Sequence, residues 1–248
     1  MKPIWGAYLE DYSTIKLIIP TSLNIKKEAI VLRGAGKKYR LVPFKEEVFG
    51  EELHLYTHFQ GVIYLHIDYQ VFLSPTFSYP LSLGKITRIP RFEFETAYDG
   101  PLGFEYHPEY TVFRIWAPVA KEVVLVLVHG DTTQDHMKYV GRGVWELKVT
   151  GDLDRWGYYY LIRVNQVLEP VLDPYGLSAS PNFTMNFVID WEKTYPMQNE
   201  RPPFSGRYVD AIIYEMHLRD FSLTRFSSLP DERRSFYLET VKPSSRYP

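Results

Sequence analysis

Short runs in which apolar and polar residues alternate are the feature that most limits the fold of this chain. Each run ends at Gly, Pro, Asp or Asn. A period of two places the apolar side chains on one face of a β-strand, whereas an amphipathic helix has a period of about 3.6. No run of helical period lies between these segments, so the sequence predicts antiparallel β-sandwiches. The predicted strands cover residues 14–20, 61–73, 111–118, 122–128, 144–150 and 158–164.

The run at residues 61–73 shows the alternation most fully. Its odd positions are apolar or aromatic, and its even positions include several polar residues. This pattern predicts a strand that is buried on one face only. The predicted inner face consists of Ile63, Leu65, Ile67, Tyr69 and Val71.

Two segments rich in turn residues divide the chain. The first is "AYDGPLG" at 97–103, and the second is "YPMQNERPPFSG" at 195–206. A chain of 248 residues can form two domains that each bury a core. The predicted organisation is a domain at 1–98, a second at 101–192, a linker at 193–208 and a remainder at 209–248.

Composition narrows the classes of partner and site. The net charge is −2, which offers no basic field for nucleic acid or for an anionic membrane. The chain has no cysteine, which excludes disulfides and thiolate metal sites. Glu10 and Asp11 interrupt any apolar core of signal-peptide length, so the expected location is cytoplasmic. Neutral ligands are the expected partners, and neither a cofactor nor a metal is predicted.

Three histidines have spacings that merit a test as metal ligands. His54 and His58 are four residues apart, and His66 follows them. This spacing places ligands together on a helix, but the region alternates as a strand and has no suitably placed carboxylate. The favoured interpretation is ordinary surface histidines.

The run "VDAIIYEMHLRDFS" at 209–222 carries many side chains of catalytic type. On a strand, Glu215, His217 and Arg219 share one face, while Tyr214 and Asp220 lie on the other. Glycoside hydrolysis requires two carboxylates on opposite sides of the scissile bond, and one strand does not supply them. The pattern therefore indicates a strand with a polar end.

Aromatic residues make up 16% of the chain, and aromatic rings stack on the C–H faces of sugars. Trp156 lies in the turn-like segment "GDLDRWG" and is the favoured sugar-binding ring. Trp145 alternates with Leu147 and Val149, which favours a core position. Further candidates lie near the first predicted strand, where core packing is the default: Trp5, Tyr8 and Tyr12.

Three stretches together resemble a known family. "YTVFRIWAPVAKEVVLVL", "GVWELKVTGDLDRWGYYYLIRV" and "LDPYGLSASPN" resemble, in this order, the family-48 carbohydrate-binding sandwich that precedes the catalytic barrel of α-1,6-glucan debranching enzymes. The run at 209–222 resembles the first barrel strand of type I pullulanases. The stretches "AYLEDYSTIKLIIP" and "GKITRIPRFEFETAYDGPLGFEYHPEYTVFRIWAP" resemble the N-terminal accessory domain of the Bacillus-type enzymes. The resemblance covers about residues 7–222.

The sequence also departs from the family. Its catalytic motifs, which bear the nucleophilic Asp, the acid/base Glu and a third Asp, do not occur, so no catalytic residue is predicted. A (β/α)8 barrel needs roughly 250 residues, and the family pattern is lost after Ser222. The expected fold is mainly β, with two immunoglobulin-like sandwiches followed by the first strand of an incomplete barrel. Truncation or a shifted reading frame is the expected cause of the loss of the family pattern after Ser222.

The predicted function is that of the non-catalytic N-terminal portion of a pullulanase-like enzyme acting on pullulan, amylopectin or glycogen, with α-glucan as its partner. The alternative is a purely structural module that binds no sugar. A third interpretation, a complete small enzyme that uses Glu215 and His217, is disfavoured. A barrel strand without neighbours exposes an apolar edge, so segment 210–222 is also expected to promote self-association.

Overall fold

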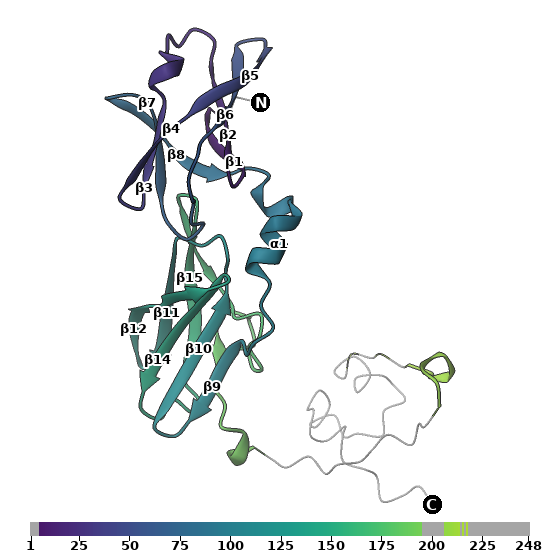
Figure 1. Ribbon diagram of the computed structural model, residues 1–248. Coiled ribbons are helices and arrows are strands. Elements are labelled where there is room, and N and C mark those ends of the chain that lie inside the picture. Colours follow the sequence, from purple (N-terminus) through teal and green to yellow (C-terminus); the bar gives the residue numbers. More distant parts are fainter. Residues whose placement is uncertain (1–4, 195–205, 214, 216, 218–248) are drawn as a thin grey trace, which may run out of the picture. The chain divides into compact units, whose positions relative to one another are not determined.

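The computed structural model describes residues 5–194, 206–213, 215 and 217 (Figure 1). The chain separates into two compact units, residues 1–194 and 195–248. The first unit contains two groups of strands, and each group surrounds a hydrophobic core of its own. This mainly β organisation confirms the predicted fold class for the two sandwiches.

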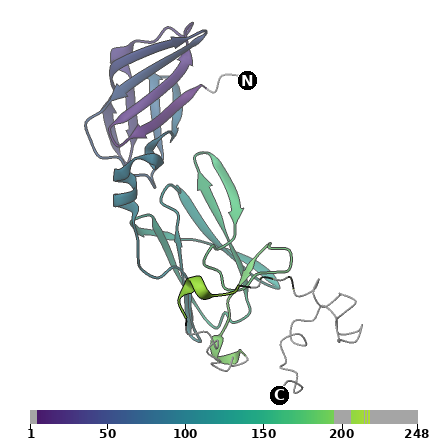
Figure 2. The same ribbon diagram turned by 90° about the vertical axis from the view of Figure 1, so that its right-hand side faces the viewer.

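The first group is an eight-stranded sheet with the order β4-β3-β7-β8-β1-β2-β6-β5. Neighbouring strands are antiparallel except for β1 and β8, which pair in parallel. Figure 2 shows these strands in two layers. The strands are β1 (Gly6–Asp11), β2 (Thr14–Pro20), β3 (Val31–Gly34), β4 (Lys37–Arg40), β5 (Val42–Phe49), β6 (Glu52–His58), β7 (Tyr69–Ser74) and β8 (Phe77–Leu83).

Strand β2 shows how the alternating pattern builds this core. Ile15, Leu17 and Ile19 are fully buried, while Lys16 and Ile18 lie on the less buried face. The same period of two is what the sequence predicted for residues 14–20, and the strand has those bounds. Short 3-10 turns at Lys27–Ala29 (η1) and Ile86–Arg88 (η2) complete this part of the chain.

The predicted strand at 61–73 is wrong over its first eight residues. Strand β7 begins only at Tyr69, and residues 61–68 form an irregular loop. Ile63 and Leu65 are nevertheless buried, as the pattern predicted. The carbonyl groups of Leu65 and Ile67 accept hydrogen bonds from the Lys121 ammonium, at 2.5 and 2.9 Å. A distant side chain therefore satisfies backbone groups that a neighbouring strand would otherwise bind.

Helix α1 (Pro90–Thr96) follows the first group of strands, although the sequence predicted no helix. Pro90 stands in its first turn, where a missing N–H costs nothing. Arg91 and Glu95 form an ion pair at 2.6 Å, and Phe92 and Thr96 face the interior. Two turns are too short to display a helical period in the sequence.

The second group forms two antiparallel sheets, with the orders β13-β14-β10-β9 and β12-β11-β15-β16; β17 also pairs with β15. The predicted strands at 111–118, 122–128, 144–150 and 158–164 are confirmed, with ends shifted by two residues at most. The strands are β9 (Gly103–His107), β10 (Tyr110–Trp116), β11 (Glu122–His129), β12 (Asp131–His136), β13 (Lys138–Gly141), β14 (Val144–Thr150), β15 (Gly157–Val164), β16 (Val167–Val171) and β17 (Asn186–Phe187).

Two buried tyrosines of β15 converge on one carboxylate in the second core. The hydroxyl groups of Tyr158 and Tyr160 donate to Asp173 Oδ2, at 2.8 and 3.4 Å. Burial raises the pKa of the Asp173 carboxyl above its usual value. These phenols fill the core with their rings and satisfy a buried acid with their polar ends, which explains part of the high tyrosine content.

Charged side chains connect the two sandwiches within the first unit. The Arg163 guanidinium donates to both oxygens of Asp68, at 3.2 and 2.9 Å, and to Glu122 at 3.0 Å. The rings of His66 and Tyr139 stack with centroids 3.9 Å apart. Together with Lys121, these contacts join the loop before β7 to strands of the second sandwich. The predicted domain boundaries stay a prediction.

The predicted barrel strand at 209–222 is not confirmed by the residues that are described. Tyr208–Asp210 form a 3-10 turn (η4), and residues 211–213 belong to no strand. Ile212 and Ile213 are 99% and 89% exposed. Barrel strands depend on partners at both edges, and no described strand pairs with this segment. Residues 214, 216 and 218–222 lie outside the described residues, and self-association of 210–222 stays a prediction.

No helix within the described residues is both long and apolar enough to cross a membrane.

Replacing Lys121 with Met is expected to lower the free energy of unfolding by about 2 kcal/mol, because the carbonyls of Leu65 and Ile67 lose their donor. Chemical denaturation followed by circular dichroism measures this change. Lys138→Met is the matched control, since Lys138 is exposed on β13, and its effect should stay within about 0.5 kcal/mol. Equal stabilities of the two variants would contradict the role given to Lys121.

Candidate functional site

The loop at residues 151–156 connects β14 to β15 and contains Trp156, the favoured sugar-binding residue. Asp152 Oδ1 accepts a hydrogen bond from the Asp154 amide at 3.0 Å, which closes a tight turn. Arg155 has a φ of +65°, a conformation that is unfavourable for a residue with a side chain. The Trp156 amide then donates to the Leu153 carbonyl at 3.0 Å. The loop is therefore held in one strained, hydrogen-bonded conformation.

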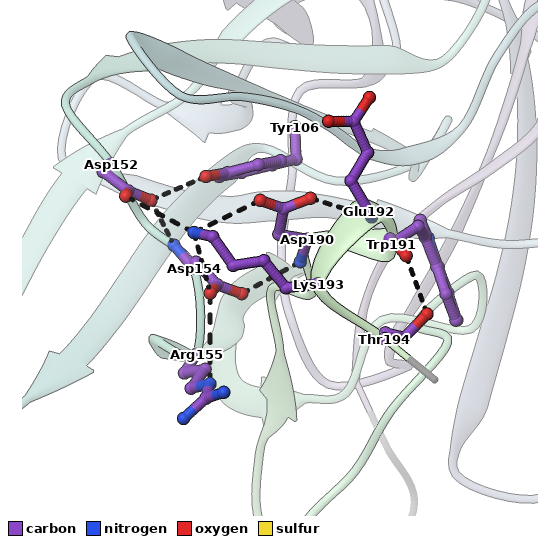
Figure 3. Close-up of polar contacts among 9 residues, drawn as sticks. All are labelled: Tyr106, Asp152, Asp154, Arg155, Asp190, Trp191, Glu192, Lys193 and Thr194. Carbon is purple, nitrogen blue, oxygen red and sulfur yellow. Dashed lines mark hydrogen bonds and ion pairs between the residues drawn. The ribbon is translucent and has the colours of Figure 1, made fainter. Parts of the chain in front are cut away.

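A lysine surrounded by three aspartates fixes this loop from the other side (Figure 3). The ammonium of Lys193, on the 3-10 turn η3 (Trp191–Lys193), lies 3.2 Å from Asp190 and 3.3 Å from Asp154. It lies 3.9 Å from Asp152. The Tyr106 hydroxyl of β9 donates to Asp152 at 2.7 Å. Ion pairs and one hydrogen bond thus connect the loop at 151–156 with β9 and η3, which are far from it in the sequence.

These contacts shift the titration of several groups in the cluster. The hydrogen bonds with Asp190 and Asp154 raise the pKa of Lys193 above its usual value. The hydrogen bond to Asp152 raises the pKa of Tyr106 to about 12. The Asp154 amide lowers the pKa of the Asp152 carboxyl. At neutral pH Lys193 and Asp152 are therefore charged, while Tyr106 is a neutral phenol that donates to Asp152.

Backbone hydrogen bonds join the loop to the segment before η3. Asp154 Oδ1 accepts from the Asp190 amide at 2.9 Å, and Asp190 Oδ1 accepts from the Glu192 amide at 3.0 Å. The Arg155 amide donates to Val188 at 2.8 Å, and the Val188 amide donates to Trp156 at 3.0 Å. The second of these aspartate contacts caps the 3-10 turn. The two segments therefore form one rigid edge of the second sandwich.

The cluster is suited to stabilising the loop at 151–156 against η3, and it offers little for catalysis. An ammonium group occupies the space among its carboxylates, so none of the three is an unpaired acid or base. Within the described ranges, no group of three His, Cys, Asp or Glu residues is arranged to hold a metal ion. What the edge can offer a ligand is its aromatic side chains.

Trp156 is half-buried, which differs from the exposed ring that its loop position predicted. Its ring packs against the second core. The His129 imidazole stacks on the indole, with centroids 4.6 Å apart and planes 5° from parallel. One face of Trp156 is therefore covered by a side chain from the end of β11. Sugar binding by Trp156 stays a prediction.

Trp191 is a more exposed ring at the same edge, and sequence reasoning missed it. The residue begins η3 and is 56% exposed. Its carbonyl accepts a hydrogen bond from the Thr194 hydroxyl at 2.7 Å, which fixes the backbone beneath the ring. A signal did exist in the sequence, because Asp190 is a capping residue that directly precedes an aromatic residue in a polar segment.

The other four predicted sugar-binding residues are distributed between core and surface. Trp145 is buried in the second core, where its indole N–H donates to the Ala117 carbonyl at 3.1 Å. Tyr12 is buried in the first core beneath the Arg91 guanidinium. Tyr8 is half-buried on β1, and Trp5 is 45% exposed just before that strand. Of the five, the structure leaves Trp5 the most accessible, and none of the three near β1 lies with the loop at 151–156.

The three histidines tested as metal ligands contact different partners. His54 pairs with Glu52 at 2.9 Å, and His58 contacts the Thr14 hydroxyl at 3.2 Å. His66 stacks on Tyr139. Glu215 and His217 are described as exposed residues, while residues 214, 219 and 220 lie outside the described part of the chain.

Replacing Lys193 with Met is expected to increase the hydrogen-exchange rates of the Asp190 and Glu192 amides several-fold, because their carboxylate acceptors lose their shared counter-ion. Amide exchange followed by NMR measures these rates. Lys138→Met serves as the control and should leave both amides unchanged. Unchanged exchange in the Lys193 variant would show that the backbone hydrogen bonds alone hold this edge.

Comparison with known proteins identifies relatives of this region. Residues 101–176 match the family described as carbohydrate-binding module 48, the isoamylase N-terminal domain. A pullulanase of Bacillus subtilis (strain 168) is 36% identical over 156 residues, which is 60% of this chain and 21% of the relative. The chloroplastic pullulanase 1 of Arabidopsis thaliana is 29% identical over 167 residues, which is 17% of that protein. The chain thus spans about a fifth of the length of these relatives.

Solved structures extend the likeness to both sandwiches. The pullulanase of Anoxybacillus sp. LM18-11 in complex with maltotriose matches with a TM-score of 0.80 and 32% identity, covering 90% of this chain and 33% of that one. Pullulanase type I from Bacillus subtilis in complex with maltose matches with a TM-score of 0.78 and 27% identity, covering 91% and 32%. The chain therefore resembles the N-terminal part of type I pullulanases over both sandwiches, and its residues 101–176 match the family-48 carbohydrate-binding module.

Proposed function

We propose that residues 5–194 serve as a non-catalytic accessory region of a pullulanase-like α-1,6-glucan debranching enzyme, and that this region contacts α-glucan. The observation that carries the proposal is the match over 90% of the chain to a pullulanase solved with maltotriose. The match to carbohydrate-binding module 48 over residues 101–176 supports the same assignment. Neutral oligosaccharides also suit a chain with a net charge of −2.

The non-catalytic role follows from the groups that the region presents. Hydrolysis of a glycosidic bond requires one carboxylic acid and one free carboxylate on opposite sides of the bond, separated by about 5 to 9.5 Å. The aspartates at the loop edge all face Lys193 instead. The family's catalytic motifs do not occur in the sequence.

Glucan contact is supported by exposed rings on rigid backbone. Trp191 presents an exposed indole at an edge that the Lys193 cluster holds in place. Such a ring removes the C–H face of a glucose unit from water while the sugar hydroxyls stay solvated. Because the backbone beneath the ring is already positioned, little backbone entropy is lost on binding.

The alternative function, a purely structural module, also has support. Trp145 and Tyr12 are buried in cores, and one face of Trp156 is covered by His129. Lys121 and Arg163 join the two sandwiches through hydrogen bonds within the chain itself. A region that only braces other parts of an enzyme requires no more than these contacts.

The chain is expected to release no reducing ends from pullulan or amylopectin, because the family's catalytic motifs, which carry the two carboxylates of the mechanism, do not occur in its sequence. A reducing-sugar assay over many hours measures this. Glu215→Gln is the informative variant, since Glu215 is the acid that a small complete enzyme would use. Activity above a buffer blank that disappears in this variant would refute the non-catalytic role.

Maltotetraose is expected to bind with a Kd of about 0.1 to 1 mM, since a few rings on a shallow surface provide only about 4 to 5.5 kcal/mol after association costs. Isothermal titration calorimetry with the whole chain measures this affinity. Trp191→Ala and Trp156→Ala test the loop edge, and Trp5→Ala is a control remote from that edge in the sequence. Absence of binding by a folded chain would favour the structural module.

A further inference from the structure

A groove of about 490 Å³ lies beside α1 and the end of β10, apart from the loop at 151–156. Small-molecule sites usually enclose about 300 to 1,000 Å³, so its size suits a ligand. Four of its nine lining residues are aromatic. The groove is lined by Thr87, Phe92, Glu93, Thr96, Ala97, Tyr98, Leu102, Trp116 and Tyr175.

Trp116 forms a fixed aromatic surface in this groove. Its indole N–H donates to the Thr96 carbonyl at the end of α1, at 2.8 Å. Pro118 and the indole edge also lie close to Gly143, which has a φ of +80° and no room for a side chain. The ring is nevertheless 39% exposed. Trp116 therefore has its polar atom satisfied while part of its apolar surface faces solvent.

Tyr175 is held in place by its backbone and by a glycine. Its amide donates to Asp173 Oδ1 at 2.9 Å, and Asp173 is itself bound by the buried hydroxyl of Tyr158. A Cβ atom at Gly103 would lie 3.1 Å from Tyr175 Cβ and 3.2 Å from its carbonyl oxygen. The backbone of β9 thus approaches Tyr175 closely, and the ring remains 44% exposed.

Tyr98 belongs to the turn-rich segment 97–103, whose sequence indicated only a break between two domains. A Cβ atom at Gly100 would clash with the Tyr98 hydroxyl, so the segment folds closely around this side chain. The Arg142 guanidinium donates to the neighbouring Ala97 carbonyl at 3.2 Å. The segment is therefore attached to the second sandwich and carries a half-buried phenol to the groove.

The polar groups around these rings are suited to hydroxyl-bearing ligands. Glu93 and Thr87 are exposed lining residues that accept hydrogen bonds, and the threonine and tyrosine hydroxyls both donate and accept. Glu93 is the only charged residue of the lining. A neutral ligand with alternating C–H faces and hydroxyl groups matches this combination better than a phosphate or a purely apolar chain.

We propose that this groove binds a short segment of α-glucan, with sugar rings stacked on Trp116 and Tyr175 and with Glu93 accepting hydrogen bonds from sugar hydroxyls. The proposal rests on the glucan contact proposed above and places that contact at a site separate from the Trp191 edge. A Cβ atom at Gly143 would clash with Pro118, and one at Gly103 would crowd the backbone of Tyr175, so both glycines leave room for the residues that position the two rings.

The test uses indole N–H resonances of the whole 15N-labelled chain, which contains five tryptophans. Maltotetraose is the probe, added up to about 10 mM to exceed the expected Kd. The Trp116 resonance, assigned with Trp116→Phe, should shift saturably. The resonance of Trp145 should stay in place, because that ring is buried in the core.

Two variants separate the groove from the rest of the surface. Tyr175→Ala should weaken the calorimetric affinity roughly threefold to tenfold, through loss of one stacking ring. Phe94→Ala is the matched control, because Phe94 lies on helix α1 beside the groove, is 81% exposed and does not line the groove. This variant should bind maltotetraose as the unaltered chain does. Circular dichroism verifies that each variant folds.

The outcomes distinguish this proposal from the proposed function. A saturable shift of Trp116 that is weakened by Tyr175→Ala and retained in Phe94→Ala supports the groove. Binding with shifts only at Trp191 or Trp156 overturns the groove and keeps the glucan contact. No binding heat and no shifted resonance in a folded chain overturn both.

Discussion

The hydrogen bonds of the Lys121 ammonium with two loop carbonyls are the interaction on which the arrangement of residues 5–194 depends. Burial lowers the pKa of Lys121 to about 8, so a charged group has been removed from water to make this contact. The carbonyls of Leu65 and Ile67 compensate for the lost hydration. The neighbouring pair of Arg163 and Asp68 adds a bidentate contact to the same loop. The two cores are therefore coupled through one irregular segment of the first sandwich.

This coupling matters for function because the aromatic groove draws on both parts of the first unit. Its lining combines η2, α1 and the following segment with β10 and the turn at Tyr175. The indole of Trp116 binds the carbonyl of Thr96, so the end of α1 and the end of β10 fix one another. If the loop contacts were lost, the proposed groove would lose part of its support. Loss of these contacts would then lower both the stability of the first unit and the affinity of the proposed groove for its ligand.

Much of the fold could be predicted from the alternating pattern. The strand at 14–20 was recognisable because its apolar residues alternate on one buried face. The strand at 122–128 was recognisable as a short apolar run and is buried on both faces. The segment at 61–68 has the same alternation, yet it is a loop. A period of two shows which side chains are buried, whereas a strand also requires a neighbouring backbone. The Lys121 side chain that replaces this backbone comes from a distant part of the sequence.

The candidate sites were harder to predict from the sequence, because the solvent exposure of a side chain depends on tertiary contacts. Trp156 lies in a turn but is covered by His129 from another strand. Trp116 occupies an alternating strand and is nevertheless exposed at its end, against α1. Trp145 was assigned to the core correctly, since Leu147 and Val149 share its face. Local pattern therefore predicted burial within strands and failed where a loop or strand end meets a second element.

Affinity electrophoresis of the whole chain in native gels that contain pullulan tests the central claim most directly, namely that this region contacts α-glucan without cleaving it. The account predicts that mobility falls progressively as the pullulan concentration rises, while the polymer keeps its chain length. Mobility that is the same with and without pullulan, in a chain shown to be folded, would contradict the account.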